Sequence, residues 1–202
     1  MTLQKKVSGL ILAGGQAKRL NYQPKGLMLF QDRPLIDYAF NAIRPVVDDL
    51  WISANQHKIS YEQWNVDIIS DDNSSFAGPL AGLLTGMRHV RCNTILMVPC
   101  DAPFIATDQL ERLVFEHFQH KTQLTVACTG KQVHSVFLVA QTALSSHLSH
   151  FLAIDQHRVK DWLAHHNTHY VDFGEQTRGF ENINTFDDFK RISMMTTFFD
   201  ES

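Results

Sequence analysis

The stretch that decides the expected fold lies close to the N-terminus and reads VSGLILAGG at residues 7–15. A short apolar run that ends on adjacent glycines is typical of a buried β-strand followed by a turn. Such a turn lets backbone N–H groups approach an anion closely. Lysines precede the run, but Ser8 and Gly9 interrupt it, so we expect a first strand here rather than a signal peptide.

Length, composition and charge narrow the classes of protein to which the chain can belong. The 202 residues are 44% hydrophobic and 19% charged, which favours a single domain that spans residues 1–202. With 18 Lys+Arg against 21 Asp+Glu, the net charge is -3, so bulk capture of nucleic acid is excluded. No run is long enough to span a membrane. Three cysteines without a CxxC spacing favour a reducing compartment, the cytoplasm.

Apolar runs alternate along the chain with segments of helical periodicity. Helices are expected over Leu35–Val46, around Leu80–Met87, after a Thr107 cap over residues 110–118, and from Thr185 to Ile192. The expected strands share a β-branched, apolar composition and are Val7–Ala13, Leu50–Ala54, Val66–Ser70, Thr94–Pro99, Leu124–Cys128, Ser135–Ala140 and His169–Phe173.

This alternation predicts an α/β fold. We expect a single Rossmann-like domain with a mostly parallel, twisted sheet, helices on both faces, and a small β-hairpin insertion around Gly130 that could wall one side of a cleft. Ligands of such sheets bind beyond the carboxyl ends of the strands, so the segments that follow the strands are the candidate site.

The first of these segments is a candidate phosphate loop. Gly14 and Gly15 would offer backbone N–H groups, and Arg19 and Lys25 would offset phosphate charge. The loop is not a Walker A sequence, because no Gly-Lys-Ser/Thr closes it, and adjacent glycines do not fit the GxGxxG of dinucleotide folds. A glycine-containing turn with solvated cations is the alternative.

Two later segments offer carboxylates. Asp101 follows the apolar strand that ends at Pro99 and suits a hard cation such as Mg²⁺, which takes carboxylate and phosphate oxygens. Asp71 precedes a glycine-rich turn and could accept hydrogen bonds from a base or a sugar. Either aspartate could instead cap a turn. Cys100 is more typical of a small buried hydrophobe than of a nucleophile.

The eleven histidines invite a zinc hypothesis. The candidates are His165, His166 and His169, and the pairs His117/His120 and His147/His150. None combines with a cysteine or carboxylate at the spacing of a structural zinc site, and each pair lies where a solvated helix face is expected, so the sequence disfavours zinc.

Five motifs together resemble a known family. They are Leu-Ala-Gly-Gly-x-x-x-Arg-Leu at residues 12–20, Pro-Lys-Gly at 24–26, Gly-Pro-Leu-Ala-Gly at 78–82, Pro-Cys-Asp-Ala-Pro at 99–103 and Asn-Ile-Asn-Thr at 182–185. In this order they are similar to those of molybdenum cofactor guanylyltransferases. The resemblance covers residues 7–192, the recognisable core of the domain, and leaves residues 193–202 as a tail. The first motif, with its arginine, and the lysine of the second are shared by many nucleotidyltransferases that make sugar nucleotides. The last three motifs, in so short a chain, narrow the resemblance to the molybdopterin group.

The resemblance implies a fold of the nucleotide-diphospho-sugar transferase type and transfer of GMP from GTP to molybdenum-molybdopterin, with release of pyrophosphate. It also implies transient contacts with proteins of molybdenum cofactor biosynthesis and molybdoenzyme maturation. The residues that it assigns to GTP are Leu12, Ala13, Gly14, Gly15, Lys25, Asp71 and Asp101, with Asp101 holding Mg²⁺ and Arg19, Lys25 and Asp101 in catalysis. Asn182 and Asn184 would face the pterin.

The chain departs from the family pattern in three places. Asn21-Tyr22-Gln23 stand where relatives often have glycines, Ser53 stands where they tend to have asparagine, and Ser135 follows His134 where they often have proline. A side-chain amide contact to the nucleotide is therefore not expected at Ser53. The alternative functions are a related transferase with another base or acceptor, such as a molybdopterin cytidylyltransferase or a sugar-1-phosphate nucleotidyltransferase, and a non-catalytic module that binds nucleotide and delivers cofactor.

Overall fold

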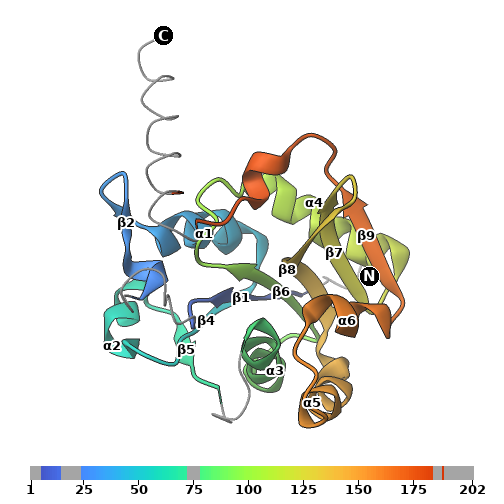
Figure 1. Cartoon of the computed structure of the whole chain (residues 1–202). Helices are drawn as coiled ribbons and strands as arrows, with labels where there is room; N and C mark the ends of the chain where they lie inside the picture. The colour runs from blue at the N-terminus through green and yellow to red at the C-terminus, as the bar shows by residue number, and fades with distance from the viewer. Residues whose placement is uncertain (1–5, 15–23, 72–77, 184–187, 189–202) are drawn as a thin grey trace.

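A computed structural model describes residues 6–14, 24–71, 78–183 and 188 of the chain. Within these ranges, seven strands pair in the order β5-β4-β1-β6-β8-β7-β9 (Figure 1). Their bounds are β1 (Ser8–Leu12), β4 (Asp49–Ser53), β5 (Asp67–Ile69), β6 (Thr94–Pro99), β7 (Leu124–Thr129), β8 (Gln132–Gln141) and β9 (Thr168–Asp172). Strand β8 runs antiparallel to both of its neighbours, and the other pairs in this sheet are parallel. The expected mostly parallel α/β sheet is confirmed.

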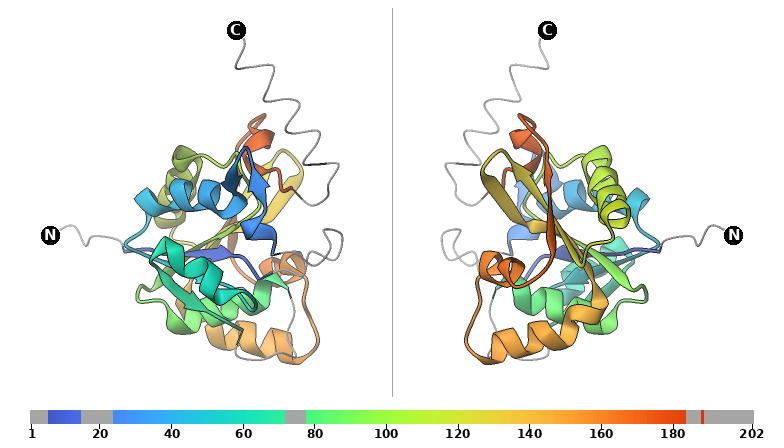
Figure 2. Two further views of the ribbon diagram at one scale, coloured as in Figure 1. Left: turned by 90° about the vertical axis from the view of Figure 1, so that its left-hand side faces the viewer. Right: turned by 90° about the vertical axis from the view of Figure 1, so that its right-hand side faces the viewer.

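Helices cover both faces of this sheet (Figures 1 and 2). On one face lie α1 (Leu35–Ile43) and α4 (Thr107–His120), and on the other lie α3 (Pro79–His89), α5 (Ser145–Ala153) and α6 (Val159–Ala164). Shorter elements are α2 (Lys58–Tyr61), a ribbon of β2 (Leu29–Phe30) and β3 (Arg33–Pro34), and 3₁₀ turns at Lys25–Leu27, Arg44–Val46, Glu62–Trp64, Thr142–Leu144 and Thr177–Phe180. No helix in the described ranges has the length and apolar character needed to cross a membrane.

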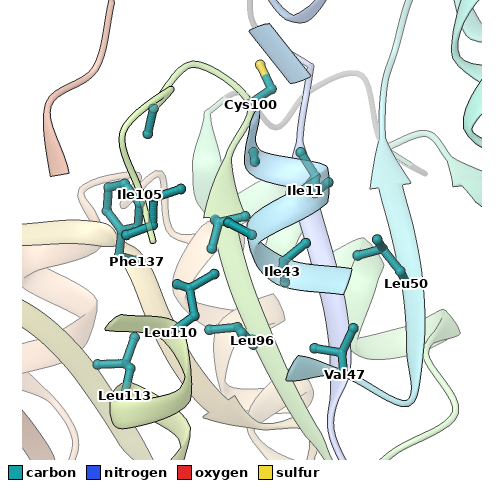
Figure 3. Close-up of a cluster of buried hydrophobic side chains, with 14 of the residues drawn as sticks. Ile11, Ile43, Val47, Leu50, Leu96, Cys100, Ile105, Leu110, Leu113 and Phe137 are labelled. Carbon is teal, nitrogen blue, oxygen red and sulfur yellow. The ribbon is translucent and has the colours of Figure 1, made fainter. Parts of the chain in front are cut away.

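Each face of the sheet has its own hydrophobic core. The core under α1 and α4 extends from Cys100 at one end to Leu113 at the other (Figure 3). The second core packs Leu83, Leu84 and Trp162 from the opposite helices onto the sheet. Burying each such side chain contributes about 1.5–3 kcal/mol, so the two cores fix the sheet whose strand ends carry the candidate site.

Three local features differ from the sequence expectations. Helix α1 gives way to a 3₁₀ turn at Arg44 because Pro45 cannot continue the helical hydrogen bonds. Thr107 is the first residue of α4 rather than its cap, and Gln109 Oε1 instead accepts a hydrogen bond from the Ala106 N–H at 3.1 Å. The expected hairpin is present as β7 and β8, but it is built into the main sheet, where β8 also pairs with β6.

Glycines allow α3 to lie close to the sheet. A β-carbon on Gly82 would lie 2.8 Å from Leu12 Cδ2 and 3.0 Å from Ser53 Oγ. Gly78 precedes the helix with a φ of 97°, which a residue with a side chain rarely adopts. The helix expected over Thr185–Ile192 and the tail lie outside the described residues, apart from Asp188, so the core boundary at residue 192 stays a prediction.

Candidate functional site

A cavity of about 240 Å³ opens at the carboxyl ends of the parallel strands. The strands end level with one another, because Leu12 is in register with Ser53 on β4 and with Pro99 on β6. This is where the fold rule for open α/β sheets places a ligand. The described residues that line the cavity are Leu12, Gly14, Lys25, Ser53, Asp71, Gly78, Pro79, Gly82, Pro99, Cys100, Asp101, Val136 and Asn182.

An ion pair between Lys25 and Asp101 lies in the wall of this cavity. Lys25 opens a 3₁₀ turn after Pro24, and Asp101 follows β6. The Asp101 segment is fixed on both sides, since the Cys100 N–H donates to Leu12 O at 3.1 Å and the Ile183 N–H donates to Asp101 O at 2.9 Å. Two loops that are far apart in the sequence therefore present one cation and one carboxylate to the same space.

Asp101 keeps one carboxylate oxygen for a ligand. Its Oδ2 pairs with the Lys25 ammonium, whereas its Oδ1 is buried and has no hydrogen-bond partner among the described residues. Burial raises the pKa of Asp101, and the Lys25 ammonium acts in the opposite direction. A buried carboxylate oxygen is costly to leave without a partner, and a hard divalent cation satisfies it. The residues present therefore fit a Mg²⁺-type ion.

Asp71 is held at the cavity by Asn55. The Asn55 Nδ2 group donates to Asp71 Oδ2 at 2.7 Å, and the Asp71 N–H donates to Asn55 Oδ1 at 2.9 Å. Asn55 and Asp71 follow the neighbouring strands β4 and β5, which explains why they meet. The reciprocal bonds fix the direction in which the Asp71 carboxylate points.

Cys100 and Tyr61 form the apolar floor behind the Lys25 turn. Burial raises the pKa of both the Cys100 thiol and the Tyr61 phenol, so both groups stay protonated at neutral pH. A β-carbon on Gly26 would lie 3.0 Å from Tyr61 Oη and 3.3 Å from Cys100 Sγ, so a glycine is needed for the turn to approach. A neutral, buried thiol is a poor nucleophile, which agrees with the expectation for Cys100.

A second hollow of about 530 Å³ adjoins the cavity, and both are lined by Asn182 and Val136. His134 and Phe180 lie in its wall with their rings stacked 4.8 Å apart. His134 Nε2 lies 2.8 Å from Thr129 Oγ1, and burial lowers the pKa of His134, so the ring is neutral near pH 7. Asn182 thus stands between two compartments, one charged and one with stacked rings.

The structure brings most of the expected site residues together. Leu12, Gly14, Lys25, Asp71, Asp101 and Asn182 all line the cavity. Ala13 is buried just outside the lining, and its N–H donates to Ser53 O at 2.8 Å. Gly15, Arg19 and Asn184 lie outside the described residues.

Sequence reasoning assigned no role to three residues at the site. Ser53 lines the cavity as a small side chain beside Gly82, Asn55 positions Asp71, and Val136 enters from β8. Asn55 could have been found, because it follows a strand at the same edge of the sheet as Asp71. Nothing local to Val136 marks it, since its place depends on β8 pairing beside β6.

A comparison with protein families decides which family the chain is part of. The model described as "MobA-like NTP transferase domain" matches residues 9–170. The chain belongs to this family. As a MobA-like NTP transferase it is a nucleotidyltransferase, and the resemblance seen in the sequence motifs is confirmed.

Relatives of similar length share about a third of their residues with the chain. A protein of Shewanella sediminis named molybdenum cofactor guanylyltransferase is 34% identical over 193 residues, which cover 96% of this chain and 97% of the relative. A protein of Pasteurella multocida with the same name is 35% identical over 181 residues, covering 90% and 96%. The MobA-like chain thus matches these relatives over nearly their whole length.

Solved structures share the fold. Molybdopterin-guanine dinucleotide biosynthesis protein A from Archaeoglobus fulgidus superposes with a TM-score of 0.80 at 18% identity, covering 94% of this chain and 98% of that one. A Mycobacterium tuberculosis protein solved in complex with manganese gives a TM-score of 0.68 at 17% identity, covering 94% and 98%. At these identities the likeness concerns the fold alone.

Proposed function

We propose that this chain transfers GMP from GTP to the phosphate of molybdenum-molybdopterin, with release of pyrophosphate. The observation that carries the proposal is the pairing of Lys25 with a buried Asp101, whose Oδ1 has no hydrogen-bond partner among the described residues and therefore suits a divalent cation. Membership in the MobA-like family and relatives named molybdenum cofactor guanylyltransferase support the choice of substrates.

In the proposed reaction, an oxygen of the acceptor phosphate attacks the α-phosphorus of GTP in line. The bond from that phosphorus to the bridging oxygen breaks, and its electron pair leaves with pyrophosphate. The protein's tasks are to place two anions side by side and to offset the charge on the leaving group. No covalent enzyme intermediate is required.

The chain's own residues divide these tasks. Phosphate charge is offset by Lys25 and the Gly14 backbone and, as the sequence motif indicates, by Gly15 and Arg19. The nucleoside is held by Leu12, Ala13 and Asp71. Asp101 would hold Mg²⁺, which would supply positive charge to offset that of the phosphates. Asn182, at the boundary of the two compartments, supports placing the pterin in the hollow with His134 and Phe180, with Asn184 on the same side.

We also infer the compartment of the reaction and the proteins that meet the chain there. Cys92, Cys100 and Cys128 are free, which supports a reducing compartment and hence the cytoplasm. Transient contact with proteins of molybdenum cofactor biosynthesis and molybdoenzyme maturation would bring the substrate and pass on the product.

The first test is pyrophosphate release from purified protein with Mg²⁺, molybdenum-molybdopterin and each nucleoside triphosphate in turn. Release with GTP is expected. Release with CTP and not with GTP would make the chain a cytidylyltransferase, and no release with any nucleotide would favour a binding and delivery module.

Lys25→Ala and Asp101→Asn should each lower turnover by about 10²–10³-fold, because each removes a preorganised charge at the reacting phosphates. Lys131→Ala and Asp161→Asn, both at exposed positions, are the matched controls and should keep wild-type turnover. Circular dichroism should show that all four variants fold. Near-wild-type turnover in either site variant would remove that residue from the mechanism.

A further inference from the structure

A second group of ligand-type side chains lies between α4 and β9. Glu116 and His120 are on α4 and His169 is on β9, and one carboxylate oxygen and two ring nitrogens from these residues all lie within 4.8 Å of one another. We propose that Glu116, His120 and His169 bind a divalent transition-metal ion of the Zn²⁺ type. This site is separate from Asp101, the proposed ligand of Mg²⁺.

The fold explains why the three side chains converge. Glu116 and His120 are four residues apart and so lie on one face of α4. His169 is in register with Thr125 on β7, so its side chain points to the same face of the sheet as that of Thr125. That face is the one covered by α4, because His117 of α4 lies 3.0 Å from Thr125 Oγ1. The helix and the strand pack together (Figure 1).

The distances suit a tetrahedral ion. Glu116 Oε2 lies 3.1 Å from His120 Nε2 and 3.4 Å from His169 Nε2. Ligand atoms about 2.1 Å from a tetrahedral Zn²⁺ are about 3.4 Å from one another. The two histidine rings stack with centroids 3.9 Å apart, closer than such an ion would hold them. The His120 side chain is 52% exposed and can rotate outward to admit the ion.

The donor set selects the class of metal. Imidazole nitrogens favour Zn²⁺ and its transition-metal neighbours, whereas Mg²⁺ prefers oxygen ligands. Three protein ligands leave the fourth position for water. The sequence pattern did not reveal this group because it paired His120 with His117, which is buried and contacts Thr125.

The position of the site indicates what a bound ion would do. Strand β9 is an edge of the sheet and pairs with β7 alone among the described strands. Helix α4 starts near the Asp101 loop and ends just before β7, so His120 lies at the end of the strands away from the cavity. The ion would join β9 to α4 and stabilise the strand that leads to Asn182, without contacting the substrates.

The test is titration of tag-free protein with Zn²⁺ by isothermal calorimetry, in buffer that already contains excess Mg²⁺. Wild-type protein should bind Zn²⁺ and its melting temperature should rise. His120→Gln, Glu116→Gln and His169→Gln should each weaken Zn²⁺ binding by about 100-fold and remove the rise, since each deletes a direct ligand. His120→Gln is the main variant because its position is exposed.

His166→Gln is the matched control. His166 Nε2 lies 3.1 Å from His147 Nδ1, so this variant removes a histidine from a different cluster and should leave the zinc site intact. Co²⁺ added to wild-type protein should give the visible spectrum of a tetrahedral site, and His120→Gln should abolish it. The proposal is overturned if wild-type protein binds no Zn²⁺ under these conditions, or if His166→Gln loses binding that His120→Gln retains.

Discussion

Asn55 fixes Asp71 at the mouth of the cavity through two reciprocal hydrogen bonds, and Asp71 is a proposed contact of the nucleoside. In Asn55→Ala the Asp71 carboxylate loses the bond that Asn55 Nδ2 donates to Oδ2, and the Asp71 backbone N–H loses its acceptor, Asn55 Oδ1. We expect the KM for GTP to rise roughly 10-fold, the equivalent of about 1.4 kcal/mol, with kcat nearly unchanged because Asp71 does not touch the reacting phosphorus. Steady-state kinetics with GTP varied at saturating acceptor measures this.

Gln56→Ala is the control, because Gln56 is the next exposed residue and has no place in the cavity lining. It should leave KM and kcat as in the wild type. A fall in kcat with unchanged KM in Asn55→Ala would mean that Asp71 acts on the chemical step and would contradict its place beside the nucleoside.

Single residues of the site could be predicted from the sequence where a motif surrounds them. Which of these residues contact one another could not be predicted. Lys25 and Asp101 each stand in a recognisable loop, so the sequence identified both. Their ion pair joins loops 76 residues apart and follows from the order of the strands. Asn55 and Asp71 pair for the same reason, because β4 and β5 are neighbours. Strand order is a property of the whole sheet, so such pairs are found only once the fold is known.

At the scale of elements, Asp49 joins β4 to β1 and to the segment before β6. Its carboxylate accepts hydrogen bonds from Ser8 Oγ at 2.5 Å, from Trp51 Nε1 at 2.5 Å and from Cys92 Sγ at 3.5 Å. Burial alone would raise the pKa of Asp49, but these hydrogen bonds outweigh burial, and the pKa lies below its usual value. The ionised carboxylate is therefore part of what holds the strands together.

The sign of the pH effect follows from the lowered pKa. Asp49 contributes stability above its unfolded pKa of about 3.9, and this contribution is lost as the pH falls through the folded value. Asp49→Asn should lower the free energy of unfolding by about 1–3 kcal/mol at pH 6 and by less at pH 3. Urea unfolding of the wild-type protein and of Asp49→Asn at both pH values measures how much the loss of stability changes between pH 6 and pH 3.

Asp161→Asn serves as the control, since Asp161 is exposed on α6. Its effect on the free energy of unfolding should be small at both pH values. If Asp49→Asn were destabilised equally at pH 3 and pH 6, the stabilisation would come from the shape of the side chain and not from its charge.

Strands and helices with a strong apolar pattern were predictable from the sequence. Very short elements, and elements in which polar residues interrupt the apolar pattern, were not. Strand β6 has the expected bounds because all six of its residues are buried and Ile95–Val98 form an uninterrupted apolar run. The β2–β3 ribbon was missed, because its two-residue strands carry no periodicity and its turn uses Gln31 and Asp32 at positive φ instead of glycine. Helix α5 was expected only as a helix face at His147 and His150, and its bounds were not predicted, because serines and histidines dilute its apolar positions.

At the scale of the whole molecule, charge determines how GTP can be bound. The net charge is -3, and the described cavity lining carries the carboxylates of Asp71 and Asp101 against the ammonium of Lys25. A highly charged nucleotide is therefore not attracted from a distance by this chain. Under the proposed function, GTP binding therefore depends on short-range contacts and on a divalent cation that neutralises the phosphates.

This balance predicts how GTP binding responds to salt and to metal. Raising NaCl from about 50 to 200 mM should change the KM for GTP by less than about threefold, because contacts within a cavity are weakly screened. A protein that captures phosphates with many surface cations loses about 10³–10⁵ in affinity over that range. Chelating Mg²⁺ with EDTA should instead abolish turnover, and added Mg²⁺ should restore it. Pyrophosphate release measured across a salt series with Mg²⁺ in excess separates the two effects. A tenfold or greater rise of KM with salt would show that cations outside the cavity capture GTP, and would contradict a site built on local charge.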